Sequence, residues 1–349
     1  MEKTTRKIKS HPEIAWLLNI TTFIKGNILE LIKDNYLRGS GTGTTWHVDI
    51  DPPKRKVKSY FEETLLTSEY MYANKTGKLL LMLSGGLDSE YVFRVFQHLK
   101  FDFTPIIVRF TGENYAGDYN AHDTKHAFAL CDKYNVTPVV IEFNFDKFVQ
   151  SGELFELMHK YHCSAYGIAS LFKVVSSLDG FVVYGNDPPY LRLNNDVWQL
   201  EEEEKIHSIL RCFKDLNLQG CPFLLSYTPE MMLSFLLDPR IVDLANDRLP
   251  GKTGTNSSKS YVFNNGSGFN MVHYDFAKAG KLQKEGLFYD APINTTPRVK
   301  LHGFEVVARQ PWFRDNEEVL KNFSTDTNLY PGCYKENYHD LVKRLSIHQ

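Results

Sequence analysis

The sequence predicts an α/β protein whose core is a doubly wound parallel sheet. Stretches that read as strands alternate with stretches of helical periodicity, and the strands fall at residues 79–83, 104–110, 137–143 and 180–184. Such alternation indicates βαβ units, whose right-handed crossovers place all strand C-termini along one edge of the sheet. Ligands of these sheets bind outside that edge, near the point where the strand order reverses. We therefore expect the functional site there.

The first strand, turn and helix form the clearest unit. Residues 79–83 are apolar without alternation, which suits a strand covered on both faces. Ser84-Gly85-Gly86 follows, and glycine allows a sharp turn and a close approach of the backbone to a ligand. Apolar residues then recur on one helix face at Leu87, Tyr91, Val92, Val95, Phe96 and Leu99. The helix N-terminus therefore opens on the turn, where its N–H groups favour an anion such as phosphate.

The six residues from Ser84 to Ser89 read Ser-Gly-Gly-Leu-Asp-Ser. They resemble the SGGxDS loop of the N-type ATP pyrophosphatases, the PP-loop superfamily, and are most similar to the synthetase domain of asparagine synthetase and β-lactam synthetase. The resemblance implies an adenine-nucleotide α-hydrolase-like (HUP-type) sheet that binds ATP and Mg²⁺ and cleaves ATP between the α- and β-phosphates. It implies that Asp88 is catalytic and binds the metal, and that the nucleotide contacts Ser84, Gly85, Gly86, Leu87, Asp88 and Ser89.

An ordinary turn at the end of a core strand is the alternative interpretation of this loop. The context of strand, turn and helix favours the phosphate loop, since short motifs gain meaning from their structural setting. The other common phosphate loop, GxxxxGK[ST], is absent from the sequence.

Other strand ends extend the resemblance toward the nucleotide. The family holds adenine with backbone near two strand ends, which implies Met82 and Val108 here, although either residue is equally well explained as core. Arg109 is a candidate for bidentate contact with a phosphate or a substrate carboxylate. Gly185 matches the first glycine of a later Gly-Glu-Gly-x-Asp-Glu type motif, whose remaining residues are not matched. The resemblance implies nucleotide contact for Gly185 and a second magnesium ligand in Asp187, whose alternative role is an Asx-type turn before a proline pair.

A catalytic lysine is expected in the C-terminal half. Members of this branch use such a lysine to stabilise the negative charge of the reaction. The resemblance implies this role for Lys281 or Lys300, and the sequence does not separate them from Lys252 and Lys259. Most lysines are solvated surface residues, which is the alternative for each of the four.

The length of 349 residues predicts about two domains. We expect an N-terminal extension over residues 1–75, made of a helix with apolar spacing between 14 and 32 and a loop. An ATP-binding α/β domain is expected over 76–190, and a mainly helical substrate or lid region over 191–349. The resemblance covers the middle part only.

Composition excludes several classes of protein. Hydrophobic residues make up 42% and charged residues 23%, as in ordinary globular proteins, and the net charge of −2 makes a nucleic-acid partner unlikely. No apolar run approaches the ~18 residues needed to cross a membrane, so no membrane partner is expected. Five widely spaced cysteines without a C-x-x-C pair favour a reducing, cytoplasmic location.

Several local patterns complete the prediction. Pro52–Lys58 is a basic run, for which a solvated loop is favoured over a phosphate or nucleic-acid contact. Glu201–Glu204 is expected to open a solvated helix. Thr228 and Pro229 read as the N-cap and first position of an apolar helix. Gly251–Gly268 is rich in Gly, Ser, Asn and Thr and reads as a mobile loop.

Two clusters have spacings compatible with a metal. His122 and His126 share one face of a predicted helix, and His159, His162 and Cys163 are similarly placed. Either could contribute to a zinc site, but neither supplies a complete ligand set, so an ordinary helix surface or core histidine is favoured.

The predicted function is an ATP-dependent adenylating ligase that activates a small-molecule carboxylate for amide formation with an amine or ammonia. The chain begins Met1-Glu2 and its first cysteine is Cys131, so we expect no glutamine hydrolysis by an N-terminal cysteine. Ammonia would come from solution, from a separate ammonia-supplying protein or from the second substrate. The alternatives are a tRNA-thiolating or phosphosulfate-type enzyme, with Cys163 or Cys333 as nucleophile, and a non-catalytic nucleotide-binding module.

Overall fold

The computed structural model describes residues 52–113, 118–161, 163, 166–186, 188–202, 204–249, 258–271, 334–347 and 349, and a strand pair at 32–33 and 47–48. In that pair, β1 (Ile32–Lys33) and β2 (His47–Val48) are antiparallel. The helix predicted between residues 14 and 32 lies outside these ranges except at Ile32, which is in β1. No helix in the described part of the chain is long and apolar enough to cross a membrane.

A parallel sheet forms the centre of the molecule, as the sequence predicts. Its strands run in the order β5-β4-β3-β6-β9, and each neighbouring pair is parallel. Their bounds are β3 (Leu79–Met82), β4 (Thr104–Thr111), β5 (Val139–Asn144), β6 (Phe181–Tyr184) and β9 (Gly220–Cys221). The chain moves outward from β3 to β5 and then returns to the other side of β3 at β6. The strand order therefore reverses between β3 and β6, which is the position where ligands of such sheets bind.

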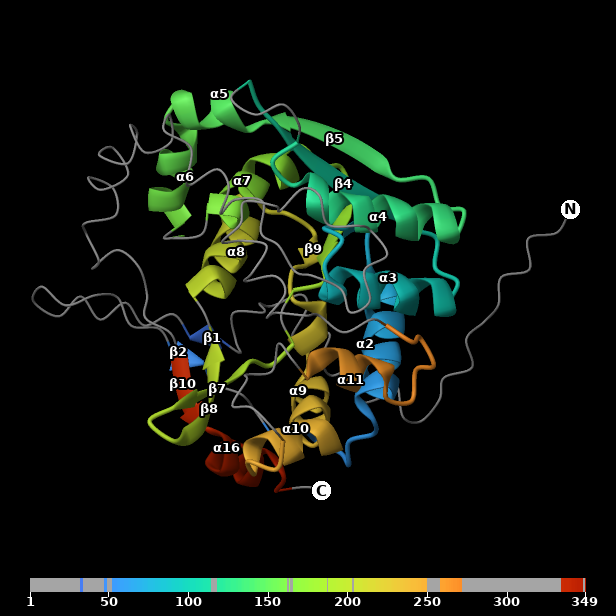
Figure 1. Ribbon diagram of the computed structural model, residues 1–349, viewed down its shortest axis with the longest axis vertical. Coiled ribbons are helices and arrows are strands. Elements are labelled where there is room, and N and C mark those ends of the chain that lie inside the picture. Colours follow the sequence, from blue (N-terminus) through green and yellow to red (C-terminus); the bar gives the residue numbers. More distant parts are fainter. Residues whose placement is uncertain are drawn as a thin grey trace, which may run out of the picture.

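Helices cover both faces of this sheet (Figure 1). The side chains of Leu79 and Leu81 pack with α3 (Leu87–His98) and α4 (Ala121–Lys133), whereas those of Leu80 and Met82 pack in the opposite layer. The second layer contains α5 (Phe145–Gln150), α6 (Glu153–Tyr161), α7 (Tyr166–Val175) and α8 (Glu204–Asp215). The continuous apolar run in β3 is thus explained by burial on both faces.

A helix that the sequence analysis did not identify, α2 (Tyr60–Asn74), precedes the sheet. Ser59 caps its N-terminus in a capping box with Glu62. The helix packs on α9 (Pro229–Leu236) and on the 3₁₀ turn η3 (Leu224–Ser226). One hydrophobic cluster therefore joins residues on both sides of the predicted boundaries after 75 and 190, and packing is continuous across them.

The described part of the C-terminal region is mainly helical, as predicted. Besides α8, it contains α9, α10 (Pro239–Ala245), α11 (Lys259–Asn264) and α16 (Tyr338–Leu345). It also contains an antiparallel sheet of β7 (Leu191–Asn194), β8 (Val197–Glu202) and β10 (Tyr334–Asn337). The prediction for α9 is confirmed, because Pro229 is its first residue and the Thr228 hydroxyl accepts a hydrogen bond from the Met231 N–H at 3.2 Å.

The helix predicted after the acidic run 201–204 is present as α8, but it begins at Glu204, because Glu201 and Glu202 still belong to β8. The reason lies in the preceding residues, where Trp198 and Leu200 are buried with a period of two, as in a strand. Asn195 and Asp196, both at positive φ, form the tight turn that pairs β8 with β7.

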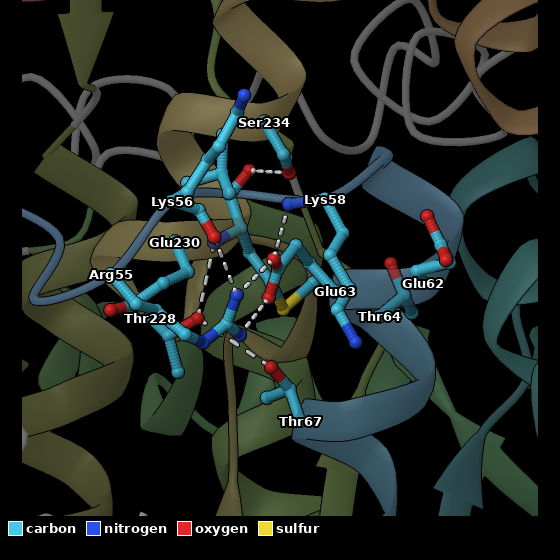
Figure 2. Close-up of polar contacts among 12 residues, drawn as sticks. Arg55, Lys56, Lys58, Glu62, Glu63, Thr64, Thr67, Thr228, Glu230 and Ser234 are labelled. Atoms are coloured by element: carbon cyan, nitrogen blue, oxygen red, sulfur yellow. Dashed lines mark hydrogen bonds and ion pairs between the residues drawn. The ribbon is translucent and has the colours of Figure 1, made fainter. Parts of the chain in front are cut away.

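The basic segment 52–58 is hydrogen-bonded to α2 and α9 and is not a wholly solvated loop (Figure 2). The Arg55 guanidinium donates two hydrogen bonds, at 2.6 and 2.5 Å, to the carboxylate of Glu63, whose side chain is 1% exposed. The backbone N–H of Lys58 donates to Glu63 at 2.7 Å, and that of Lys54 donates to Glu230 at 3.1 Å. The segment therefore links α2 to α9, while the side chains of its lysines remain exposed as predicted.

Candidate functional site

The Ser84–Ser89 loop lies at the reversal of strand order. Ser84 Oγ accepts a hydrogen bond from the Gly86 N–H at 3.2 Å and lies 3.1 Å from Ser89 Oγ, and the Ser89 hydroxyl donates to the Gly86 carbonyl at 3.0 Å. Gly86 is the N-cap of α3 and provides no side-chain cap. The two hydroxyls therefore fix the loop, and the positive end of the helix dipole faces the turn without a capping side chain at the N-cap position.

Two glycines allow the loop to pack closely against its neighbours. Gly85 has φ of +86°, and a Cβ there would lie 1.9 Å from the carbonyl oxygen of Asp123 in α4. A Cβ on Gly185, at the end of β6, would lie 2.8 Å from both the Asp88 carbonyl oxygen and Ser89 Cα. Gly185 thus brings the end of β6 against the first turn of α3, which gives this predicted nucleotide contact a definite packing role.

A buried ion pair marks the N-terminus of α3. Lys259 Nζ lies 2.7 Å from Asp88 Oδ2, across a separation of 171 residues, and the two side chains are 4% and 17% exposed. The other carboxylate oxygen, Asp88 Oδ1, is buried and has no hydrogen-bond partner among the residues that the structure describes. Buried carboxylate oxygens are normally satisfied, so an unsatisfied one beside a phosphate-type loop indicates a place for a ligand.

Lys259 is the one of the four candidate lysines that falls within the described residues, and it contacts Asp88. Lys281, Lys300 and Lys252 lie outside the described residues. Lys259 falls within the predicted mobile loop 251–268, and this prediction is wrong for residues 259–264, which form α11. The sequence signal for this helix is the apolar pair Val262 and Phe263, which lies three and four residues after Lys259 and so on the same helix face. In the structure both side chains are 0% exposed.

Asp88 suits one position in the coordination of Mg²⁺. Magnesium usually takes one or two protein carboxylates and fills its remaining positions with water and substrate phosphate oxygens. Asp88 Oδ1 offers one such ligand, and the described residues contain no group of three or more His, Cys, Asp or Glu side chains suited to a metal. The predicted second ligand, Asp187, lies outside the described residues.

The two residues predicted to flank adenine have buried side chains. Met82 and Val108 are each 6% exposed and belong to the core layer of α5–α8. The Val108 carbonyl accepts a hydrogen bond from Asn120 Nδ2 at 2.8 Å, and the Phe110 N–H donates to Asn120 Oδ1 at 2.9 Å. The Asn120 side chain therefore bonds the β4 backbone beyond the end of β3, a contact that the sequence analysis missed.

Arg109 is already paired with two carboxylates. Its guanidinium contacts Asp118 at 2.6 and 3.1 Å and Glu142 at 2.6 Å. It lines an open hollow of about 650 Å³ between α4 and the edge strand β5, together with Asp118, Ala121, Thr124, Lys125, Phe128, Val140 and Glu142. Three of its five N–H donors are thus engaged, and a phosphate or substrate carboxylate at Arg109 would share the guanidinium with these acidic partners.

The described cysteines are poorly suited to nucleophilic chemistry. Cys163 is 0% exposed, and burial raises the pKa of the Cys212 thiol to about 12 and that of Cys131 to about 11. A nucleophilic cysteine needs access and a thiolate, which burial in an apolar layer disfavours. Cys333, the other candidate, lies outside the described residues.

Comparison with known proteins adds no family assignment. No protein-family model matches the sequence, and no curated protein does.

Proposed function

We propose that this chain binds magnesium–ATP at the Ser84–Ser89 loop and is an AMP-forming ligase of the PP-loop, asparagine-synthetase type on a HUP-type sheet. The observation that carries the proposal is the Asp88–Lys259 pair at 2.7 Å, in which Asp88 Oδ1, at the start of α3, is buried and has no partner in the described part of the chain. The pair sets an acidic ligand and a cation beside the N-terminus of a helix, at the reversal of strand order. Such a site combines a metal ligand with stabilisation of phosphate charge.

Each group then has a role. The α3 N-terminus and the hydroxyls of Ser84 and Ser89 would hold the β- and γ-phosphates. Asp88 would hold the metal, which would supply charge neutralisation when bound. Lys259 would stabilise negative charge as pyrophosphate leaves, in the role that the resemblance implied for Lys281 or Lys300. Nucleotide contacts by Met82, Leu87, Val108 and Gly185 remain part of the proposal.

The reaction proceeds in two displacements. An oxygen of the substrate carboxylate attacks the α-phosphorus of ATP, the bond to the bridging oxygen breaks, and pyrophosphate leaves with the electron pair. The nitrogen of an amine or ammonia then attacks the acyl carbon, loses a proton and displaces AMP, which forms the amide. Catalysis of both steps depends mainly on positioning and charge stabilisation.

The rival that uses sulfur chemistry is disfavoured by the burial of Cys163, its candidate nucleophile within the described residues. Its test is alkylation of the native protein with iodoacetamide. Unchanged turnover after complete alkylation of Cys333, verified by peptide mass spectrometry, would exclude a role for Cys333. Loss of turnover, protected by ATP, would favour the rival.

Product analysis tests the proposal. Purified protein is incubated with ATP and magnesium, alone and with a panel of amino acids and ammonium, and nucleotides are separated by chromatography. We expect AMP and pyrophosphate in equal amounts, only when the correct carboxylate is present. ADP and phosphate would contradict the proposal, whereas ATP binding without turnover for any acceptor would favour the non-catalytic binding module.

A further inference from the structure

Helix α11 is attached to α3 at two places. The first is the ion pair between Lys259 and Asp88, and the second is a stack of the Phe263 and Tyr91 rings, whose centroids lie 4.3 Å apart with an interplanar angle of 8°. Lys259 and Phe263 are four residues apart on α11, and Asp88 and Tyr91 are three apart on α3. Residues at these spacings share a helix face, so the ion pair and the ring stack lie one turn apart along both helices.

The ring stack is rigidly enclosed. Tyr91 and Phe263 are both 0% exposed, and the Tyr60 ring of α2 lies 6.0 Å from Tyr91 and 6.1 Å from Phe263, nearly parallel to both. The Tyr60 hydroxyl donates to the Leu225 carbonyl at 2.8 Å, which fixes that ring in turn. Three buried rings therefore hold α11 in one position on α3.

The outer side of α11 is also held. The Arg240 guanidinium of α10 lies 4.1 Å from the centroid of the Tyr261 ring. The side chain of Asn265, immediately after α11, donates to Asp238, the N-cap of α10, at 2.7 Å. A helix of only six residues has little stability of its own, so these contacts determine where it lies.

We propose that Tyr91 and Phe263 are positioning residues that place the Lys259 ammonium at Asp88. The inference rests on the proposed function for its catalytic consequence, although the positioning itself does not. A lysine has a flexible four-carbon stem, and its ammonium is strongly hydrated. It stays at 4% exposure only while the α11 backbone is held close to the carboxylate. Loss of the stacked ring should therefore release Lys259 toward solvent and lower turnover with little change in fold.

The test compares Phe263→Leu, which removes a ring from the stack, with Phe96→Leu. Phe96 is also 0% exposed and also lies on α3, but its aromatic partners are Phe101 and Phe103, away from α11. Both variants lose the same atoms from the core. Tyr91→Phe is the conservative variant, since it keeps the stacked ring.

The first readout does not depend on activity. The native protein is acetylated with an N-hydroxysuccinimide ester, and modification of Lys259 is quantified by peptide mass spectrometry against the exposed Lys100. We expect Lys259 to react about tenfold faster in Phe263→Leu than in the wild type, because access to a buried group follows local opening. In Phe96→Leu and Tyr91→Phe, Lys259 should react at the wild-type rate. Equal Lys259 reactivity in Phe263→Leu and Phe96→Leu, with both folded, would overturn the positioning role.

The second readout is kinetic. In Phe263→Leu we expect kcat for AMP formation to fall about tenfold, with KM for ATP changed less than twofold, since misplacement of a catalytic group lowers the rate of the chemical step. A rise in KM for ATP with unchanged kcat would overturn the inference. So would a fall in kcat in Phe96→Leu equal to that in Phe263→Leu. If the wild type forms no AMP, the proposed function fails, and the acetylation result still decides the positioning.

Discussion

Two buried ion pairs of this protein differ in how fully their carboxylates are satisfied. Both oxygens of Glu63 are used, because Oε1 accepts from Arg55 and from the Lys58 N–H and Oε2 accepts from Arg55 (Figure 2). In the other pair, Asp88 Oδ2 contacts Lys259, and Oδ1 is buried without a partner within the described ranges. Both oxygens of the first carboxylate are therefore engaged within the protein, whereas the second carboxylate retains an oxygen that accepts no hydrogen bond from the described residues.

The difference separates a structural pair from a candidate functional one. A saturated buried pair stabilises the packing of the elements that it joins, and breaking it is costly because one charge is left uncompensated. A buried polar atom without a partner destabilises the protein by itself and needs another explanation, such as a ligand. The Arg55–Glu63 pair should therefore matter for stability, and the Asp88–Lys259 pair for ATP.

The largest expected effect follows the loss of the Asp88 charge. In Asp88→Asn, we expect turnover to fall by about 10³-fold, because a preorganised charged contact to the reacting phosphates is removed. The amide keeps an oxygen for Lys259, so circular dichroism should show the native fold. Wild-type turnover in Asp88→Asn would contradict the functional role of this pair, and so would failure of the variant to fold.

Removal of Glu63 should instead act on stability. We expect Glu63→Ala to lower the free energy of unfolding by about 3 kcal/mol in urea titrations, at the lower end for a broken buried pair, because Arg55 is 21% exposed. The control is Glu69→Ala, an exposed position on the same helix, which should change stability by less than about 0.5 kcal/mol. An unchanged unfolding curve for Glu63→Ala would remove the distinction between the two pairs.

A comparison of two glycines should sharpen the account of the loop. Gly85 and Gly152 have φ of +86° and +81°, but a Cβ would meet Asp123 at 1.9 Å in the first case and nothing within 4 Å in the second. We expect Gly152→Ala to cost about 1 kcal/mol through backbone strain alone. Gly85→Ala should cost more and weaken ATP binding, measured by calorimetry. Equal stability and equal ATP affinity in both variants would show that the close approach is unimportant.

The smallest expected effect concerns Glu230, which is 2% exposed and accepts from the Lys54 N–H. Burial raises its pKa above the ordinary value of 4.5. The folded state then binds this proton more tightly than the unfolded state, so the contribution of Glu230 to stability is full below pH 4.5 and is lost as pH rises through the raised pKa.

Glu230→Gln keeps the acceptor for Lys54 and cannot ionise. We expect its stability in urea to be equal to or above that of the wild type at pH 7, and to fall less between pH 5 and pH 7. If the wild type instead gained stability relative to Glu230→Gln between pH 5 and pH 7, the raised pKa assigned to Glu230 would be contradicted.

Four strands of the central sheet and the loop after β3 could be predicted because their signals are local, whereas the two-residue strand β9 was missed. The apolar run of β3, the glycines after it and the periodicity of α3 are all read within about twenty residues. The helix α2 was missed because much of its buried face is polar, with Thr64, Thr67 and Ser68 at most 3% exposed. Apolar periodicity, the main signal for a helix, is therefore weak in this stretch.

The candidate site could be predicted only in part, since half of it comes from elsewhere in the chain. Asp88 belongs to a local motif, whereas its partner Lys259 lies 171 residues away and is brought to it by packing of α11 on α3. Asn120 was missed for the same reason, because its bonds to the β4 backbone depend on the path of the chain after β4. The predicted contact between Arg109 and a phosphate or substrate carboxylate remains a prediction. The guanidinium already contacts Asp118 and Glu142.

The most direct test of the central claim is calorimetric titration of α,β-methylene-ATP, an analogue that resists cleavage between the α- and β-phosphates. The titration is carried out with and without magnesium, on the wild type and on Asp88→Asn. The account predicts that magnesium strengthens binding to the wild type and that this dependence is lost in Asp88→Asn. No binding to the wild type, or the same magnesium dependence in both proteins, would contradict the assignment of Asp88 as the ligand-binding carboxylate.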